Sequence, residues 1–189
     1  VPDVEKRLKA LKARGGKLVV VDPRRSETAA MADQHVFVRP GNDAALLLGL
    51  LNTLFDEGLT RTSHLPVNGL AQVQAAIAEF TAEAMSSRCG VPAATIRQLA
   101  RDFAGAESAV CYGRMGVSTQ AFGSLCHWLI QLINLVTGNL DQPGGALCTT
   151  PALDLVATTA GGHFNVWQSR VSGLPEYGGE LPVAALAEE

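Results

Sequence analysis

The sequence of 189 residues lacks the patterns that mark several large classes of proteins. It has no run of 18 or more apolar residues, so it contains no segment that reads as a transmembrane helix. Charged residues make up only 17 % of the chain, and the formal net charge is −3. Disordered chains carry more charge and nucleic-acid-binding proteins present a basic surface, so we expect neither disorder nor a nucleic-acid partner.

Cysteine and histidine are scarce and scattered. The four cysteines form no C-x-x-C pair, and the four histidines form no H-x-H or H-E-x-x-H motif. Because structural zinc and iron–sulfur sites are built from such pairs, we predict no metal ligand in this chain. Scattered single thiols fit a reducing compartment, which favours the cytoplasm and leaves the periplasm open.

Apolar residues are plentiful, at 47 %, and their spacing predicts alternating helices and strands. We expect helices at about 3–14, 25–32, 43–57, 70–79, 81–88, 92–104 and 119–137, and strands at 17–22, 35–38 and 108–113. This alternation is typical of an α/β fold, with a Rossmann-like parallel sheet and helices on both of its faces.

The composition changes near residue 146, after which Gly, Pro, Thr and Ser are common and periodicity is weak. We therefore predict that residues 1–147 form the α/β domain, or part of it, and that residues 148–189 form a connector to a neighbouring domain. The chain opens within a helical pattern and ends in "AALAEE", which resembles the start of another helix. These features lead us to expect a piece of a longer protein.

The strand at 17–22 ends in the sequence Asp22-Pro23-Arg24-Arg25. Ligands of open parallel sheets bind beyond the carboxyl ends of the strands. There, the Asp22 carboxylate could accept hydrogen bonds from N1–H and the 2-amino group of guanine, and the arginines could face a phosphate. Alternatively, Asp22 caps the next helix with Pro23 at its first position. The two interpretations are compatible, because the N-terminus of a helix also attracts phosphate.

The turn "RPGND" follows the second predicted strand in the same way. Gly41 would let a ligand approach the backbone closely. Asn42 and Asp43 could bind a ribose or a base, or they could simply cap the helix that follows.

The loop "YGRMGVSTQ" follows the third predicted strand. Exposed backbone N–H groups at Gly113 and Gly116 could hold a pyrophosphate, although Met115 is of a type that more often fills a core. Since all three turns come directly after predicted strands, we expect them to gather at one edge of the sheet.

Taken in order, these stretches resemble the molybdopterin oxidoreductases, the dimethyl sulfoxide reductase superfamily. The resemblance is carried by "VVVDPRR", "TAAMAD", "RPGNDAALLLGLL", "GVPAATIRQLARDFA", "YGRMGVSTQ" and "LVTGNLDQPGG". Their order and spacing agree with the family over residues 1 to about 147. The resemblance implies a domain that binds molybdopterin guanine dinucleotide, the cofactor that holds molybdenum or tungsten in these enzymes.

By position within the motifs, the resemblance assigns cofactor contacts to Asp22, Pro23, Arg24, Gly41, Asn42, Asp43, Gly113, Met115 and Gly116. The family often has Gln four residues after the methionine. Here Thr119 holds that place and Gln120 comes next. One residue turns a helix by roughly 100°, so the resemblance leaves open which of the two contacts the cofactor.

The chain contains neither the family's cysteine motif for an iron–sulfur cluster nor the residue that ligates the metal. The resemblance therefore implies a cofactor-binding fragment that is inactive alone, with no catalytic residue, and that positions the guanosine tail for two-electron redox chemistry. The implied partners are the remaining domains of the parent, which carry the iron–sulfur cluster, and electron-transfer subunits. Two alternatives stay open: another nucleotide-binding α/β domain, and a non-catalytic interaction domain.

Overall fold

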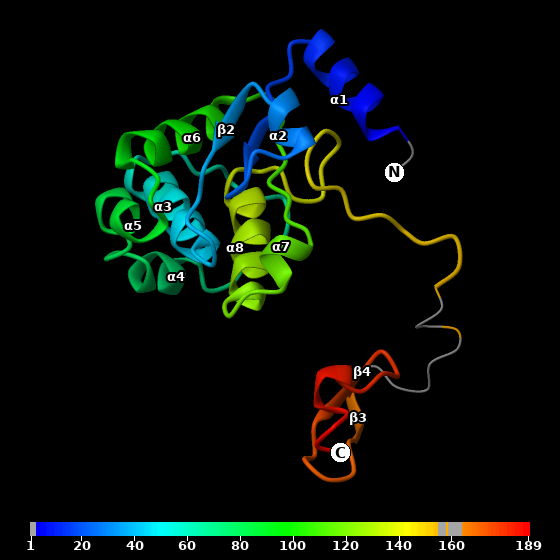
Figure 1. Ribbon diagram of the computed structural model, residues 1–189. Coiled ribbons are helices and arrows are strands. Elements are labelled where there is room, and N and C mark those ends of the chain that lie inside the picture. The colour runs from blue at the N-terminus through cyan, green and yellow to red at the C-terminus, as the bar shows by residue number, and fades with distance from the viewer. Residues whose placement is uncertain (1–2, 155–157, 159–163) are drawn as a thin grey trace. The chain divides into compact units, whose positions relative to one another are not determined.

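The computed structural model describes residues 3–154, 158 and 164–189. The chain divides into two units, Val1–Cys148 and Thr149–Glu189, which are described separately (Figure 1). Among the described residues, no helix is both long and apolar enough to cross a membrane.

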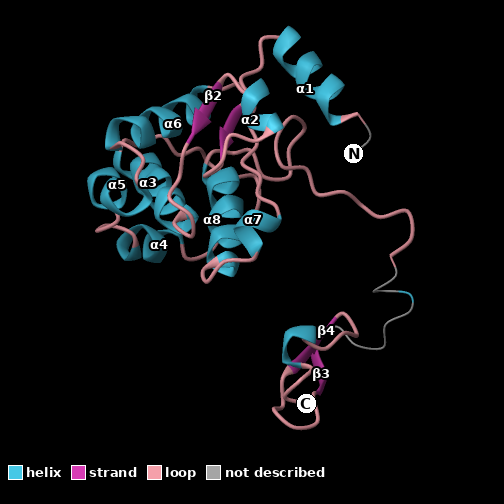
Figure 2. Ribbon diagram, in the orientation of Figure 1, coloured by secondary structure: helices cyan, strands magenta, loops and turns pink. Residues whose placement is uncertain are grey.

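The first unit combines helices with a small parallel sheet, which confirms the predicted α/β class (Figure 2). Its elements are α1 (Val4–Ala13), β1 (Val19–Val21), α2 (Glu27–Met31), β2 (Gln34–Val36), α3 (Asp43–Asp56), α4 (Leu70–Ala76), α5 (Ala82–Cys89), α6 (Ala93–Gly105), α7 (Met115–Ser118) and α8 (Gly123–Val136).

Strands β1 and β2 lie parallel, with Val19 beside Gln34 and Val21 beside Val36. The β-branched run Val19–Val21 favours an extended backbone, and α2 joins the two strands and contacts both of them. Val19, Val36 and Val38 pack with residues of α3, α5 and α6. The parallel β–α–β arrangement that the sequence predicts is therefore present, with two strands in the described part of the unit.

Charged side chains fix the start of β1. The backbone N–H of Leu18 donates to Asp33 Oδ2 (2.8 Å), and Lys12 Nζ lies 2.9 Å from Asp33 Oδ1. These contacts, the Leu18 N–H first and then Lys12, hold the pKa of Asp33 below its ordinary value. On the same stretch, Lys17 pairs with Asp102 of α6 at 2.5 Å.

Helix α3 is buried on almost every side because it lies between two apolar clusters. One cluster joins α3 to α8, and the other joins it to β2, α5 and α6. Leu51 and Leu54 are 0 % and 1 % exposed. A Cβ on Gly49 would lie 3.2 Å from both Met85 and Ile96, so this glycine lets α5 and α6 approach closely. Burial of each leucine contributes about 1.5–3 kcal/mol.

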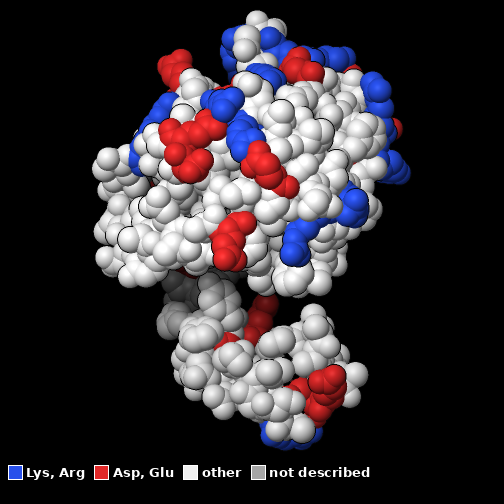
Figure 3. Space-filling model, turned by 90° about the vertical axis from the view of Figure 1, so that its left-hand side faces the viewer, with Lys and Arg blue, Asp and Glu red and all other residues white. Residues whose placement is uncertain are grey.

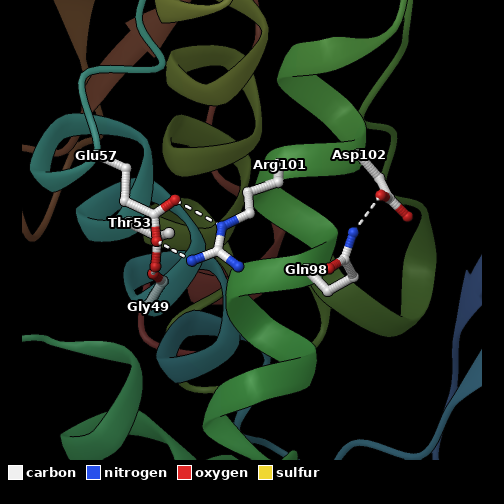
Figure 4. Close-up of polar contacts among 6 residues, drawn as sticks. All are labelled: Gly49, Thr53, Glu57, Gln98, Arg101 and Asp102. Carbon is white, nitrogen blue, oxygen red and sulfur yellow. Dashed lines mark hydrogen bonds and ion pairs between the residues drawn. The ribbon is translucent and has the colours of Figure 1, made fainter.

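The solvent side of this bundle carries charges of both signs, interspersed over the face in Figure 3. Arg101 of α6 binds the Glu57 carboxylate with two hydrogen bonds of 2.7 and 2.8 Å, and Gln98 donates to Asp102 on the same helix (Figure 4). Arg97 pairs with Glu83 of α5. The pairs of Arg101 and Arg97 join α6 to its neighbours at the surface, where exposed ion pairs each contribute little.

The predicted strand at 108–113 is wrong, because the described residues there form no ladder with another strand. Instead, side-chain amides of α8 and the turn after it bind the segment. Asn134 accepts from the Cys111 N–H (2.8 Å) and donates to its carbonyl (2.9 Å), and Asn139 accepts from the Ala109 N–H (3.0 Å). Asn134 is 0 % exposed.

The helix predicted at 119–137 begins later, at Gly123, and the short helix α7 precedes it. A tight turn separates the two helices. The Gly123 N–H donates to the Gln120 carbonyl (3.0 Å), and a Cβ on Gly123 would lie 2.1 Å from the Ser118 carbonyl oxygen. Only glycine fits at that distance, so this turn between the two helices requires Gly123.

The second unit contains a hairpin that the sequence analysis did not anticipate. Strand β3 (Phe164–Gln168) pairs antiparallel with β4 (Pro175–Tyr177), and a 3₁₀ turn, η1, spans Val183–Ala185. The buried Glu176 carboxylate accepts from the N–H groups of Val166 (2.9 Å) and Gly179 (3.0 Å). The role of residues 148–189 as a connector stays a prediction.

Replacing Asn134 with alanine should destabilise the first unit, because it leaves the Cys111 N–H without its partner in the interior. We expect the free energy of unfolding, measured by urea denaturation, to fall by about 3 kcal/mol. Gln131→Ala, on the exposed side of the same helix, is the control and should change it by less than about 0.5 kcal/mol. A loss below about 1 kcal/mol in Asn134→Ala would contradict this role.

The lowered pKa of Asp33 predicts a pH dependence of stability. The carboxylate is stabilised more in the folded than in the unfolded chain, so its contribution is complete above the unfolded pKa, about 4, and is lost as the pH falls below it. Asp33→Asn should therefore be less stable than the wild type at pH 7, and the difference should shrink below about pH 4. Thermal unfolding from pH 7 to pH 2 measures this, with the exposed Glu79→Gln as control. A difference that is independent of pH would argue against it.

Candidate functional site

One side chain joins two of the three turns singled out in the sequence. Gln120 Nε2 donates to Asp43 Oδ2 at the first residue of α3 (2.9 Å) and to the Gly116 carbonyl within α7 (2.8 Å). The two partners come from stretches far apart in the chain. The turn "RPGND" and the loop "GRMGVSTQ" therefore meet at the N-terminus of α3.

The oxygen of the same amide, Gln120 Oε1, is buried and has no hydrogen-bond partner among the described residues. The amide orientation is fixed, because the reverse orientation would set an oxygen against the Asp43 carboxylate. A buried acceptor without a donor costs about 1–3 kcal/mol. Gln120 therefore holds an acceptor that an N–H or O–H group can satisfy.

Two glycines in these turns have open backbone. Gly41 has φ +74°, a conformation that favours glycine, and a Cβ there would meet no atom within 4 Å. Gly116 is exposed and equally open. Gly113 differs, since a Cβ there would lie 2.6 Å from Ile130 Cδ1. The small size of Gly113 thus allows Ile130 of α8 to pack closely against it. This packing role is separate from any contact that the Gly113 N–H makes with a ligand.

Met115, Thr119 and Gln120, in the later loop, have different surroundings. Met115 is 67 % exposed at the start of α7, so it does not fill the core. Thr119, the C-cap of α7, donates its Oγ1–H to the Met115 carbonyl at the start of that helix (2.8 Å). Gln120, in contrast, reaches across to α3. Which of the two residues contacts a cofactor stays a prediction.

The cap interpretation of Asp22 is wrong. Helix α2 begins at Glu27, and its N-cap is Ser26, whose Oγ accepts from the Ala29 N–H (3.3 Å). Asp22 Oδ1 instead accepts from the Arg24 N–H (2.7 Å), so Pro23 lies inside a turn and not at the first position of a helix. Asn42 likewise makes no side-chain cap, since its amide donates to the Pro40 carbonyl (3.1 Å).

A shallow, open depression of about 500 Å³ follows the Asp22 turn, and Arg24, Arg25 and the start of α2 line it. No hydrogen bond or ion pair between described residues joins residues 22–25 to 41–43 or to 115–120. The structure therefore brings two of the three predicted turns into contact, and Asp22 remains outside that contact.

Sequence reasoning missed one polar pair beside the later loop. Ser118 Oγ lies 2.7 Å from His127 Nε2, where it links α7 to α8. No spacing rule for a single helix pairs residues nine positions apart, so the turn between the helices had to be known first. Among the described residues, no group of three or more His, Cys, Asp or Glu side chains could hold a metal ion.

The cysteines near this region are poor nucleophiles. Burial raises the pKa of the Cys111 thiol to about 12. Burial, and then the nearby Asp43 carboxylate, also raise the pKa of the Cys126 thiol. Since the thiolate is the reactive form, both side chains serve packing rather than chemistry.

Comparison with known proteins gives one consistent result. Residues 3–173 match the family model described as molybdopterin oxidoreductase. Trimethylamine-N-oxide reductase of Haemophilus influenzae is 32 % identical over 146 residues, which cover 72 % of this chain and 18 % of that protein. Assimilatory nitrate reductase of Haloferax mediterranei is 32 % identical over 195 residues, which cover 92 % of this chain and 27 % of that protein.

A solved structure agrees with these matches. Acetylene hydratase from Pelobacter acetylenicus superposes with a TM-score of 0.68 at 27 % sequence identity, and the match covers 74 % of this chain and 20 % of that one. The chain thus spans about a fifth of the length of the relatives that it matches first.

The cysteine environments predict an order of alkylation. Cys148 is exposed and should react first with iodoacetamide at pH 8, whereas Cys111 should stay unmodified because its pKa lies near 12. The buried Cys89 and Cys126 should also resist until the chain unfolds. Peptide mass spectrometry over time measures this, with urea-unfolded protein as the control. Equal rates at Cys111 and Cys148 in folded protein would contradict the described packing.

Proposed function

This chain belongs to the molybdopterin oxidoreductase family, and from that premise we propose that residues 1–147 hold the guanosine diphosphate tail of a molybdopterin guanine dinucleotide within a longer enzyme. The remaining parts of that enzyme would carry the metal ligand and the iron–sulfur cluster. They would also determine the substrate.

The observation that carries the proposal is the contact of Gln120 with Asp43. It fixes two glycine-containing turns next to one another, and Gly41 and Gly116 keep their backbone open to a ligand. The unpaired acceptor of Gln120 is the kind of group that a nucleotide's N–H or O–H donors satisfy. The residues present therefore fit the tail of this cofactor.

Charge at the turn after β1 adds support. Arg24 and Arg25 are exposed at the depression that follows β1, where they suit the negative charges of a diphosphate. Asp22 uses one carboxylate oxygen to accept from the Arg24 N–H. A carboxylate has about four acceptor positions, so Asp22 keeps capacity for the two N–H groups of a guanine edge.

In this proposal the chain performs no redox step itself. When bound, the metal of the cofactor would supply two-electron redox chemistry in the parent enzyme. The residues of this chain would position the cofactor. Hydrogen bonds from the turns fix the tail, and a fixed tail fixes the orientation of the rest of the cofactor.

Replacing Gln120 in the parent enzyme tests the central contact. Gln120→Leu keeps a side chain of similar size but removes the N–H₂ donor and the C=O acceptor of the amide. We therefore expect the turns to separate and cofactor affinity to fall about tenfold, equivalent to 1.4 kcal/mol. Molybdenum or tungsten and guanosine monophosphate released by acid would be measured per mole of purified enzyme. Thr119→Val is the matched control and should retain full occupancy. The proposal fails if Thr119→Val loses the cofactor and Gln120→Leu keeps it.

Asp22→Asn tests the guanine contact separately. An amide presents an N–H₂ group where guanine needs an acceptor, so affinity for the guanosine tail should fall about tenfold or more. The measurement is cofactor occupancy of the parent enzyme, together with competition by guanosine diphosphate and adenosine diphosphate. Wild-type protein should prefer the guanine nucleotide. Normal occupancy in Asp22→Asn would remove this residue from the site, and equal competition by both nucleotides would favour a different nucleotide-binding domain.

A further inference from the structure

We propose that the side chain of Phe37 stacks on the face of the purine base whose edge Asp22 binds. The cofactor contacts assigned from the sequence do not include Phe37, which lies between the turn after β1 and the turn "RPGND". This inference deepens the proposed function and rests on it, because it takes the ligand at this edge of the sheet to be a guanosine tail.

The first observation is a side chain that joins β2 to the end of β1. His35 Nε2–H donates to the Asp22 carbonyl (2.9 Å), and the Asp22 N–H donates to the Val36 carbonyl (3.1 Å). Both backbone groups of Asp22 are therefore bonded to β2. These contacts fix the Asp22 turn relative to the strand that leads directly into Phe37.

The second observation is a ring contact between His35 and Phe37. Their ring centroids lie 4.1 Å apart, and the two planes are inclined by 50°. Side chains alternate between the two faces of an extended chain, and Val36 and Val38 are buried in the cluster with α3, α5 and α6. His35 and Phe37 therefore lie on the opposite face, where Phe37 is 59 % exposed.

The place of this ring carries the argument, because single exposed apolar side chains are common. Among the described residues of the first unit, Tyr112, Phe122 and Trp128 are also exposed aromatic side chains. None of these three is linked to the Asp22 turn by a printed ring contact or hydrogen bond between described residues, whereas Phe37 is linked to it through His35. An aromatic surface is thus held beside the turn that contains the proposed guanine contact.

A bound purine needs a partner for its face as well as for its edge. Hydrogen bonds to the Asp22 carboxylate would lie in the plane of the base and would leave its flat faces free. Aromatic side chains bind such faces by stacking, and they do so for any base because every base has a π-face. In this arrangement Asp22 distinguishes guanine from adenine, and Phe37 adds affinity for both.

The test titrates guanosine diphosphate, adenosine diphosphate and pyrophosphate into the parent enzyme purified without its cofactor. Phe37→Leu keeps an apolar side chain but removes the ring, so both nucleotides should bind about tenfold more weakly. The preference for guanine should persist, and pyrophosphate, which has no base, should bind as it does to the wild type. Phe164→Leu removes an exposed ring of the second unit and is the matched control, which should bind all three ligands normally.

Phe37→Trp reports the contact directly. Indole stacks on a base as well as phenyl does, so this variant should bind guanosine diphosphate with about wild-type affinity. Stacking also quenches indole emission. Saturating guanosine diphosphate should therefore lower the fluorescence of Phe37→Trp by more than that of the wild type, and pyrophosphate should not.

Two results would overturn the proposal: undiminished affinity of Phe37→Leu for guanosine diphosphate, or no added quenching in Phe37→Trp at saturation. If Phe37→Leu loses nucleotides and pyrophosphate alike, the substitution has distorted the site, and the quenching of Phe37→Trp decides. A failure of the proposed function appears in the wild type itself, which would then bind no guanosine diphosphate, and the inference fails with it. A failure of this inference alone appears only in the variants.

Discussion

The burial of α3 is the constraint on which the rest of the first unit depends. This helix contacts α5 and α6 through one apolar cluster and α8 through the other, so its position fixes all three. Its first residue, Asp43, is thereby held where Gln120 can reach it. A helix with an apolar surface almost all round can only be stable inside such a bundle, and the polar contact at its N-terminus follows from that packing.

The two turns that Gln120 joins differ from the apolar core in their open backbone and in their incomplete hydrogen bonding. Gly41 and Gly116 keep the backbone open, and Gln120 holds the two turns together with an acceptor that stays unpaired. Polar groups left partly unsatisfied beside open glycines are expected where a ligand completes the hydrogen bonding. In the proposed function, that ligand is the guanosine tail of a cofactor of the molybdopterin oxidoreductase family, to which the chain belongs.

Prediction from sequence succeeded where the pattern is local. The valines of β1, the amphipathic and buried helices and the parallel β–α–β unit all follow from short-range spacing, and they lie within a few residues of the predicted positions. Prediction from sequence failed where contacts between residues far apart in the chain override the local pattern. Residues 108–113 have the composition of a strand, but Asn134 and Asn139 take the place of a neighbouring strand.

By itself, the sequence determined the α/β class, the family and the turns that carry candidate site residues, because these depend on local spacing and on motif order. Only the tertiary structure decided that Gln120 and not Thr119 reaches α3, that Ser26 and not Asp22 caps α2, and that α8 starts at Gly123. The Gln120 contact depends on a distance between residues far apart in the chain, and the start of α8 depends on a close steric contact at Gly123. The Ser26 cap is a local hydrogen bond, and it is set by where packing lets α2 begin. Such distances are set by packing, which spacing along a sequence does not encode.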